Sequence, residues 1–323
     1  MPDRERYTNL PLSLSPMPVE KTGGFGWEQV QRIADRMVRA VGKAFIDAVL
    51  GSRRTIPQAD LEAAINTRRV QPVLDVMGPI TRDLEQRLRG GEFANSLETT
   101  YVNAGRQAMK DATDAIMANR RRTGLALRPR FDITNPRSIE FLRAYDYTLI
   151  RELVDQTRLG IGALVEDGYK NGKSLYDTTQ RIRKLPGFGL TQRQMQAVLN
   201  YENSLLEGGM DRARVDKLTA SYREKMLKRR AENIARTETI RAANYGQQEA
   251  WRQAREAGLL PAEARRFWVV TPDDRLCPEC RQIPGMNKDG VGLDEVYQTP
   301  FGPLPGPPAH PQCRCAQRLR SEL

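Results

Sequence analysis

Five side chains that bind metals well lie close together near the C-terminal end of the chain. Cys277-Pro-Glu-Cys280 places two thiols three positions apart, and His310-Pro-Gln-Cys313-Arg-Cys315 supplies an imidazole and two more thiols. The chain has 4 cysteines and 1 histidine, and all of them belong to this set. Thiolate sulfur and imidazole nitrogen are the ligands of closed tetrahedral zinc sites, in which two closely spaced pairs come from separate segments.

The spacing therefore predicts a structural Zn²⁺ ion bound by Cys277, Cys280, His310 and one of Cys313 and Cys315. Four ligands are needed and five are present, so the sequence does not choose between the last two. Closing the intervening loop of about 30 residues costs only a few kcal/mol. A structural zinc ion contributes on the order of 10–16 kcal/mol in small peptides. We expect the metal to order the Pro- and Gly-rich residues 284–311, which lack a core of their own.

Other chemistry fits these residues less well. A disulfide needs an oxidising compartment, and the N-terminal residues contain no secretory signal. A redox C-x-x-C needs a βαβ setting, and a deaminase needs its histidine before the C-x-x-C rather than after it. A single histidine also excludes a Ser-His-Asp set outside the cluster. Asp273, Asp274 and Glu279 are expected to form turns and carry solvated charge, so the sequence predicts a protein that is not an enzyme.

The elements that position this cluster are predicted to be mainly helical. Recurring apolar residues predict long helices over residues 26–50, 93–119, 135–166 and 211–257. A further stripe over 73–88 follows an interruption at Pro72, and shorter helices are predicted after Pro57, Ser174 and Thr191. Two strands, 266–271 and 313–319, are predicted to pair.

The last long helix has two contrasting faces. Small residues such as Ala235 and Gly246 line one face, so another helix could approach closely. The opposite face carries a charge run that is expected to be solvated, namely Arg223, Lys225, Lys228, Arg229 and Arg230.

The predicted fold class is mainly α, with elongated helical domains and a small α+β C-terminal module stabilised by zinc. A basic segment with Gly and Pro, residues 120–130, predicts a boundary between two helical domains. The predicted organisation is a flexible arm (1–25), an N-terminal helical domain (26–130), a central helical domain (131–258) and a zinc-binding module (259–323).

The net charge and the hydropathy of the chain indicate which classes of partner to expect. The net charge of +11 and pI near 9.7 attract polyanions in a salt-dependent way. No stretch of 18 or more apolar residues is present, so no membrane contact is predicted.

Several residues over about 135–318 occur in an order that resembles a known family. They are Ala235-Arg-Thr-Glu-Thr239, Asn244, Gly246, Trp268, Asp274 and Arg275 before the Cys277 pair, Gly285, Pro307-Pro308 and the His310–Cys315 segment. The pattern resembles the phage Mu protein F-like head morphogenesis family, the minor head proteins of tailed phages. The resemblance implies a capsid component in the virion, in the head interior or at the portal vertex, after assembly in the host cytoplasm. Its implied partners are the portal protein and other capsid or scaffold proteins, with non-specific contact to phage DNA.

An alternative from a different class is a free nucleic-acid-binding zinc protein. Basic residues around the module motivate it, namely Arg265, Arg266, Arg275, Arg281, Arg314, Arg318 and Arg320. Within the helical motif, we expect Arg236 and Glu238 to form an ion pair that fixes helix packing.

Overall fold

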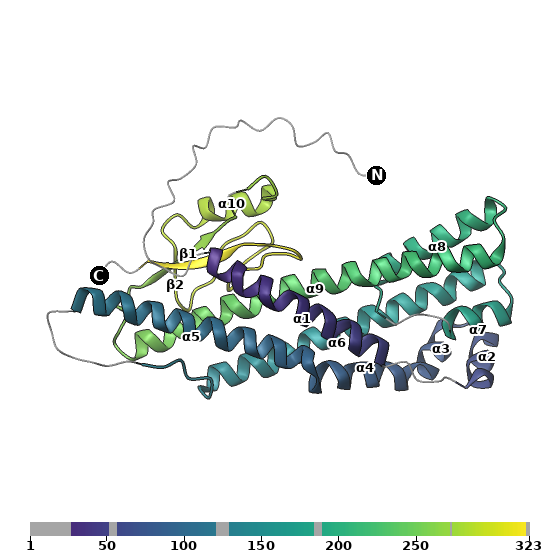
Figure 1. The fold of residues 1–323 in the computed structure, drawn as a ribbon, viewed down its shortest axis with the longest axis horizontal. Coiled ribbons are helices and arrows are strands. Elements are labelled where there is room, and N and C mark those ends of the chain that lie inside the picture. Colours follow the sequence, from purple (N-terminus) through teal and green to yellow (C-terminus); the bar gives the residue numbers. More distant parts are fainter. Residues whose placement is uncertain (1–26, 52–56, 121–128, 184–188, 272, 321–323) are drawn as a thin grey trace.

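The computed structural model describes residues 27–51, 57–120, 129–183, 189–271 and 273–320. The predicted arm, residues 1–25, lies outside these ranges, as does most of the predicted boundary segment. The described chain forms an elongated array of helices with a small three-stranded sheet beside one end (Figure 1). The prediction of a mainly helical protein is confirmed. Among the described helices, none is long and apolar enough to cross a membrane.

The helices follow the predicted order closely. Their bounds are α1 Trp27–Gly51, α2 Gln58–Asn66, α3 Val70–Val76, α4 Gly78–Gly90, α5 Glu92–Arg120, α6 Pro136–Lys170, α7 Leu175–Arg183, α8 Gln192–Glu207, α9 Arg212–Glu256 and α10 Pro278–Met286. Pro72 does not interrupt a helix, because it lies in the first turn of α3, where a missing N–H costs nothing. The break comes instead at Met77, between α3 and α4.

Side chains at the helix starts explain where several helices begin. Asn135 accepts from the N–H of Arg137 at 3.0 Å, ahead of Pro136 at the first position of α6. Thr191 and Gln194 form a capping box at the start of α8. These side chains satisfy N–H groups that have no partner within the helix, which is why the sequence located these boundaries well.

Helix α9 is the longest element, with 45 residues, and it extends along most of the molecule (Figure 1). Helices α1 and α5 both pack against it. Gly246 allows the closest approach, because a β-carbon at this position would lie 2.1 Å from the carbonyl oxygen of Tyr101 on α5. The predicted small-residue face is therefore a helix-packing face.

The largest hydrophobic core joins parts of the chain that are far apart in sequence. It includes Phe45 and Leu97 from the first helices and Leu164, Val198 and Leu227 from later ones. The two helical regions on either side of residues 121–128 therefore share one core. The proposed domain division remains a prediction about sequence organisation.

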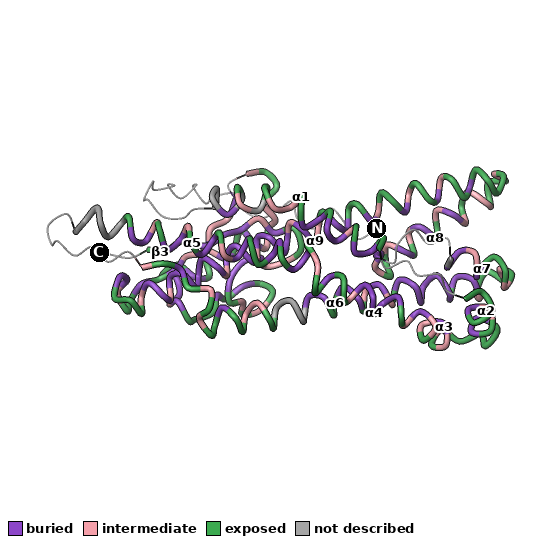
Figure 2. The backbone as a smooth tube through the Cα atoms, turned by 60° about the horizontal axis from the view of Figure 1, so that its bottom comes forward, coloured by how far each residue is buried: buried purple, intermediate pink, exposed green. Residues whose placement is uncertain are grey.

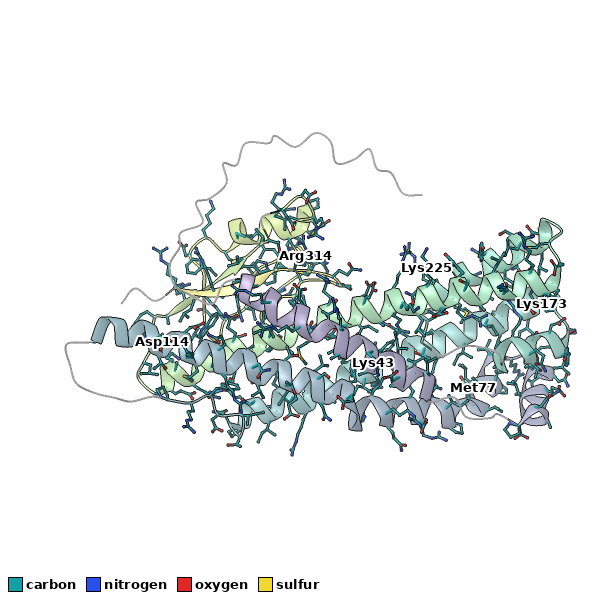
Figure 3. All side chains as sticks on the ribbon, in the orientation of Figure 1. Lys43, Met77, Asp114, Lys173, Lys225 and Arg314 are labelled. Carbon is teal, nitrogen blue, oxygen red and sulfur yellow. The ribbon has the colours of Figure 1, made fainter. Side chains whose placement is uncertain are left out.

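The predicted charged face of α9 is only partly solvated. Lys225, Lys228 and Arg229 are exposed, and Lys225 projects from the helix into solvent (Figure 3). Arg223 and Arg230 are buried, which corrects the prediction for these two residues. Arg230 donates to the carbonyl oxygen of Gly189, and burial lowers its pKa to about 10. Arg223 and Arg230 lie on the side of α9 that faces the core. The sequence did not indicate their burial, because both residues are close in sequence to exposed lysines.

A buried ion-pair network closes the end of the bundle away from the sheet. Arg181 on α7 donates to Asp167 at 2.9 Å and to Glu202 at 2.8 Å, and all three side chains are almost fully buried. Burying charges is costly unless each one is paired. The network therefore fixes α6, α7 and α8 relative to one another, while the outer surface of this end is largely exposed (Figure 2).

The C-terminal module is built on a sheet with the order β2-β1-β3. Its strands are β1 (Arg265–Val269), β2 (Val291–Gly292) and β3 (Ala316–Arg320), and both neighbours run antiparallel to β1. Phe267 pairs with Arg318 and Val269 with Ala316. The predicted pairing of residues 266–271 with residues 313–319 is confirmed by β1 and β3, and β2 is an additional short strand.

The contact between Gly246 and Tyr101 generates a stability prediction. The substitution Gly246→Ala should lower the free energy of unfolding by about 1–3 kcal/mol through overpacking. This loss should occur even though alanine has a helix propensity about 1 kcal/mol better than glycine. Thermal unfolding followed by circular dichroism measures it. Gly90→Ala is the matched control, because nothing lies within 4 Å of a β-carbon there. Equal melting temperatures for the two variants would contradict the proposed close packing.

Candidate metal centre

The first pair of donors lies at the start of α10. Cys277 is the N-cap residue, and its sulfur accepts from the N–H of Cys280 at 3.3 Å. Pro278 occupies the first helical position, where its fixed φ suits the turn. This local geometry turns both sulfurs to the same side of the chain, as the C-x-x-C spacing predicted.

His310 completes a group of three donors with this pair. Its Nε2 lies 3.2 Å from the sulfur of Cys277 and 3.2 Å from that of Cys280. Its Nδ1 lies 2.8 Å from the carbonyl oxygen of Pro311. In the tautomer with its proton on Nδ1, His310 donates to that carbonyl and directs the Nε2 lone pair at the sulfurs. Such an outer hydrogen bond commonly orients a metal-binding histidine.

Cys313 and Cys315 form a second group with Cys280. The three sulfurs lie within 4.8 Å of one another, and all three residues are buried. The Cys280 and Cys313 sulfurs are 3.8 Å apart. The hydrogen bond between them lowers the pKa of Cys313 and raises that of Cys280. The structure thus brings all five predicted donors together, and the two overlapping groups could hold a metal ion.

The turn that carries His310 and Cys313 is fastened to α9. Gln312 has a φ of 62°, and its N–H donates to the Thr237 hydroxyl at 2.9 Å. The Gln312 side chain also donates to the side chain of Asn233. Thr237 is the central residue of the helical motif, so this motif supports the donor turn. Sequence reasoning placed both segments in one pattern but did not predict their contact.

The expected ion pair within that motif differs in the structure. Glu238 pairs with Arg241 at 3.3 Å, one helical turn further along. Residues two positions apart on a helix, such as Arg236 and Glu238, do not face each other. Neither charge of the expected pair lies in the donor cluster itself.

The sequence did not predict a structural role for Arg266. In the structure, this residue organises the loop that leads to His310. It is fully buried on β1 and donates to the carbonyl oxygen of Gly292 at 3.1 Å. It also donates to the carbonyl oxygens of Glu295 and Pro305. Its guanidinium lies 4.8 Å from the ring centroid of Tyr297, which is itself fully buried. Burial lowers the pKa of Arg266, although the five donors of a guanidinium suit several carbonyls at once.

This arrangement corrects the prediction that residues 284–311 lack a core. Leu293 and Tyr297 are fully buried, and the ring of Tyr297 meets Trp268 edge-on at a centroid distance of 5.2 Å. Gln248 on α9 donates to the carbonyl oxygen of Leu293 at 2.9 Å. The segment is ordered by packing on β1 and α9, two surfaces that are remote in sequence.

Strand β3 is joined to α9 by a pair of amide side chains. The side-chain oxygen of Asn244 accepts from the N–H of Gln317 at 3.1 Å, and the Gln317 side chain donates to the Asn244 carbonyl at 2.7 Å. Both residues are fully buried. Asn244 belongs to the helical motif, so this second motif residue also binds the module.

Asp273, one of the acidic residues near the cluster, holds the loop through Arg314. Arg314 binds Asp273 through two hydrogen bonds of 2.5 and 2.6 Å. This interaction, assisted by the N–H of Arg275, lowers the pKa of Asp273. A carboxylate that holds its charge so firmly is a poor general base. The geometry agrees with the predicted role of Asp273 in turn formation.

The Arg266 contacts generate a second stability prediction. Arg266→Met should destabilise the module by more than about 3 kcal/mol, because three carbonyls in a buried loop lose a charged donor. Arg265→Met is the matched control on the exposed face of the same strand, and should cost less than about 1 kcal/mol. Limited proteolysis within residues 291–306 and thermal unfolding report the difference. Equal resistance of the two variants would contradict the role assigned to Arg266.

One family of known proteins matches a part of the chain that includes α9 and the metal-donor cluster. A comparison with curated proteins and with solved structures gave no match. Residues 160–318 match the model of a family described as Phage Mu protein F like protein. The matched segment runs from within α6 into β3, so it contains α9, its contacts to the module and all five donors. Residues 160–318 therefore match the Phage Mu protein F like family, as the motifs of the sequence predicted.

Proposed function

We propose that this protein is a minor head protein of a tailed phage, located inside the head at the portal vertex, with a structural zinc ion in its C-terminal module. The family match supports the coarse assignment, since it suggests a head-morphogenesis protein of the virion. The observation that carries the proposal is the match over residues 160–318, because it includes the motif helix and the donor cluster that the helix supports.

The donor set fits zinc. Zinc binds sulfur at about 2.3 Å and nitrogen at about 2.0–2.1 Å in a tetrahedron, which places two sulfurs about 3.8 Å apart and a sulfur and nitrogen about 3.5 Å apart. The corresponding separations are 3.8 Å between Cys280 and Cys313, and 3.2 Å from His310 to each of its two cysteine neighbours. Soft sulfur donors favour zinc over magnesium or calcium.

The environment supports a structural role for the metal rather than catalysis. Cys280, Cys313 and Cys315 are buried, and Cys277 and His310 are partly buried. The protein offers enough donors to fill every position of a tetrahedron, whereas a catalytic zinc keeps one position for water. Asp273, which could have served as a base, is bound to Arg314. We therefore propose that the protein is not an enzyme.

In this proposal the metal connects two parts of the module that α9 and β1 position separately. Helix α10 supplies Cys277 and Cys280, whereas the turn held by Thr237 supplies His310 and Cys313. A bound ion would fix α10 relative to α9. Because few copies of a minor protein must occupy a defined place in a head, we infer that the module is a rigid contact surface for the portal or another capsid protein.

Portal association generates the third prediction. When the chain is produced with the portal protein of the same phage, the two should co-elute as an oligomer. Size-exclusion chromatography with mass spectrometry of assembled heads measures the association. The control is co-production with the major capsid protein alone, which should retain less of the chain. Heads that assemble at normal yield without incorporating the chain would contradict the proposal.

The alternative of a free nucleic-acid-binding protein depends on the arginines of the module. Arg266 is buried, and Arg314 is bound to Asp273, so neither forms an open basic surface. Arg275 and Arg281 are exposed near the cluster, and they are the residues that favour this alternative.

DNA binding by the whole chain distinguishes the two functions. We expect weak, non-specific binding that falls steeply with salt, and a change of less than about threefold for the Arg275→Gln/Arg281→Gln double variant, since each phosphate contact adds only a small increment. Fluorescence anisotropy with duplex DNA across a salt series measures both. Tight binding that is lost in the double variant would favour the nucleic-acid-binding protein.

A further inference from the structure

We propose that Cys313 is the fourth zinc ligand and that Cys315 remains outside the coordination sphere. This inference rests on the proposed zinc site, and it resolves the choice between two cysteines that the sequence left open. It follows from the backbone that carries each sulfur.

Two turns of the same span present the donors. In the first, Cys277 and Cys280 are joined by a bond from the Cys280 N–H to the Cys277 sulfur. In the second, His310 and Cys313 are joined by a bond of 3.1 Å from the Cys313 N–H to the His310 carbonyl. Each turn carries two donors three positions apart in the sequence. A tetrahedral ion is completed when two such pairs face each other.

The sulfur positions agree with this pairing across the cluster. Cys280 and Cys313 are 3.8 Å apart, the separation expected for two sulfurs on one zinc ion. Backbone N–H groups of Cys315 and Ala309 also donate to the Cys313 sulfur. Such bonds stabilise a thiolate ligand from outside the coordination sphere. In this geometry the main chain of Cys315 supports Cys313, and its own side chain is not required as a donor.

The backbone on both sides of Cys315 is occupied by other contacts. The carbonyl oxygen of Arg314 accepts from the Thr271 hydroxyl at 3.0 Å, and Ala316 is paired with Val269 in the sheet. These contacts fix the backbone on both sides of Cys315 and limit how far its sulfur can move toward Cys277 and His310. The Cys315 side chain is held in the buried cluster that also contains Trp268, Cys280 and Cys313.

Metal analysis of three full-length proteins tests this assignment. Zinc content and competition with a chromophoric chelator are measured for the unaltered chain, Cys315→Ser and Cys313→Ser. Loss of an outer partner typically weakens metal binding about 10–100-fold or less. We expect Cys315→Ser to keep one zinc ion with an affinity within about tenfold, and Cys313→Ser to lose more than about 100-fold.

Cobalt substitution provides an independent readout. The sulfur-to-cobalt charge-transfer absorption should be unchanged in Cys315→Ser and reduced in Cys313→Ser, because only the second variant loses a coordinating thiolate. A Cys315→Ser protein that loses its zinc or this absorption would overturn the assignment, even if Cys313→Ser fails to fold. Failure of the unaltered chain to bind zinc would overturn the zinc site itself, which separates the two failures.

Discussion

The positions of α1, α5 and the C-terminal module depend on the surface chemistry of α9. Along one side this helix has small residues. At Gly246 the backbone of α5 comes so close that a β-carbon would clash with the carbonyl oxygen of Tyr101. At Thr237, Asn244 and Gln248, α9 instead presents buried polar groups that bind the C-terminal module. A buried polar group without a partner is costly, so these three contacts specify one docking position for the module. Apolar packing alone would tolerate sliding along the helix.

The helical part of the family pattern serves to dock the C-terminal module on α9. The segment Ala235–Thr239, with Asn244 and Gly246, contains none of the five candidate metal donors. Its polar members accept hydrogen bonds from Gln312 and Gln317, one next to the donor turn and one in β3. Residues separated by about 75 positions are thereby constrained together. The motif and the cysteine cluster form one structural unit, which explains why one family model covers both.

The sequence predicted much of the helical structure because local signals determine it. Asn135 and Thr191 cap helices through side chains that are close in sequence, and apolar periodicity marks the long helices. The donor cluster was also predictable, because its residue types are scarce in this chain and metal spacing is specific. The roles of Arg230 and Arg266 could not be read in the same way. Their partners are carbonyls of distant segments, and a carbonyl oxygen is present at every residue, so the sequence carries no mark of the pairing.

The Arg266 network changes what a metal in the proposed site would have to contribute to folding. In a small zinc peptide the ion supplies nearly all of the folding free energy, on the order of 10–16 kcal/mol. Here the loop already has a buried guanidinium at Gly292, Glu295 and Pro305, and an aromatic contact between Trp268 and Tyr297. These contacts organise one side of β1, whereas the donors bring together α10 and the turn after Pro308. In the proposed site, the free energy of metal binding would therefore be available mainly to fix α10 against the α9-bound turn. The ion would then determine the shape of the outer surface of the module more than its existence as a folded unit.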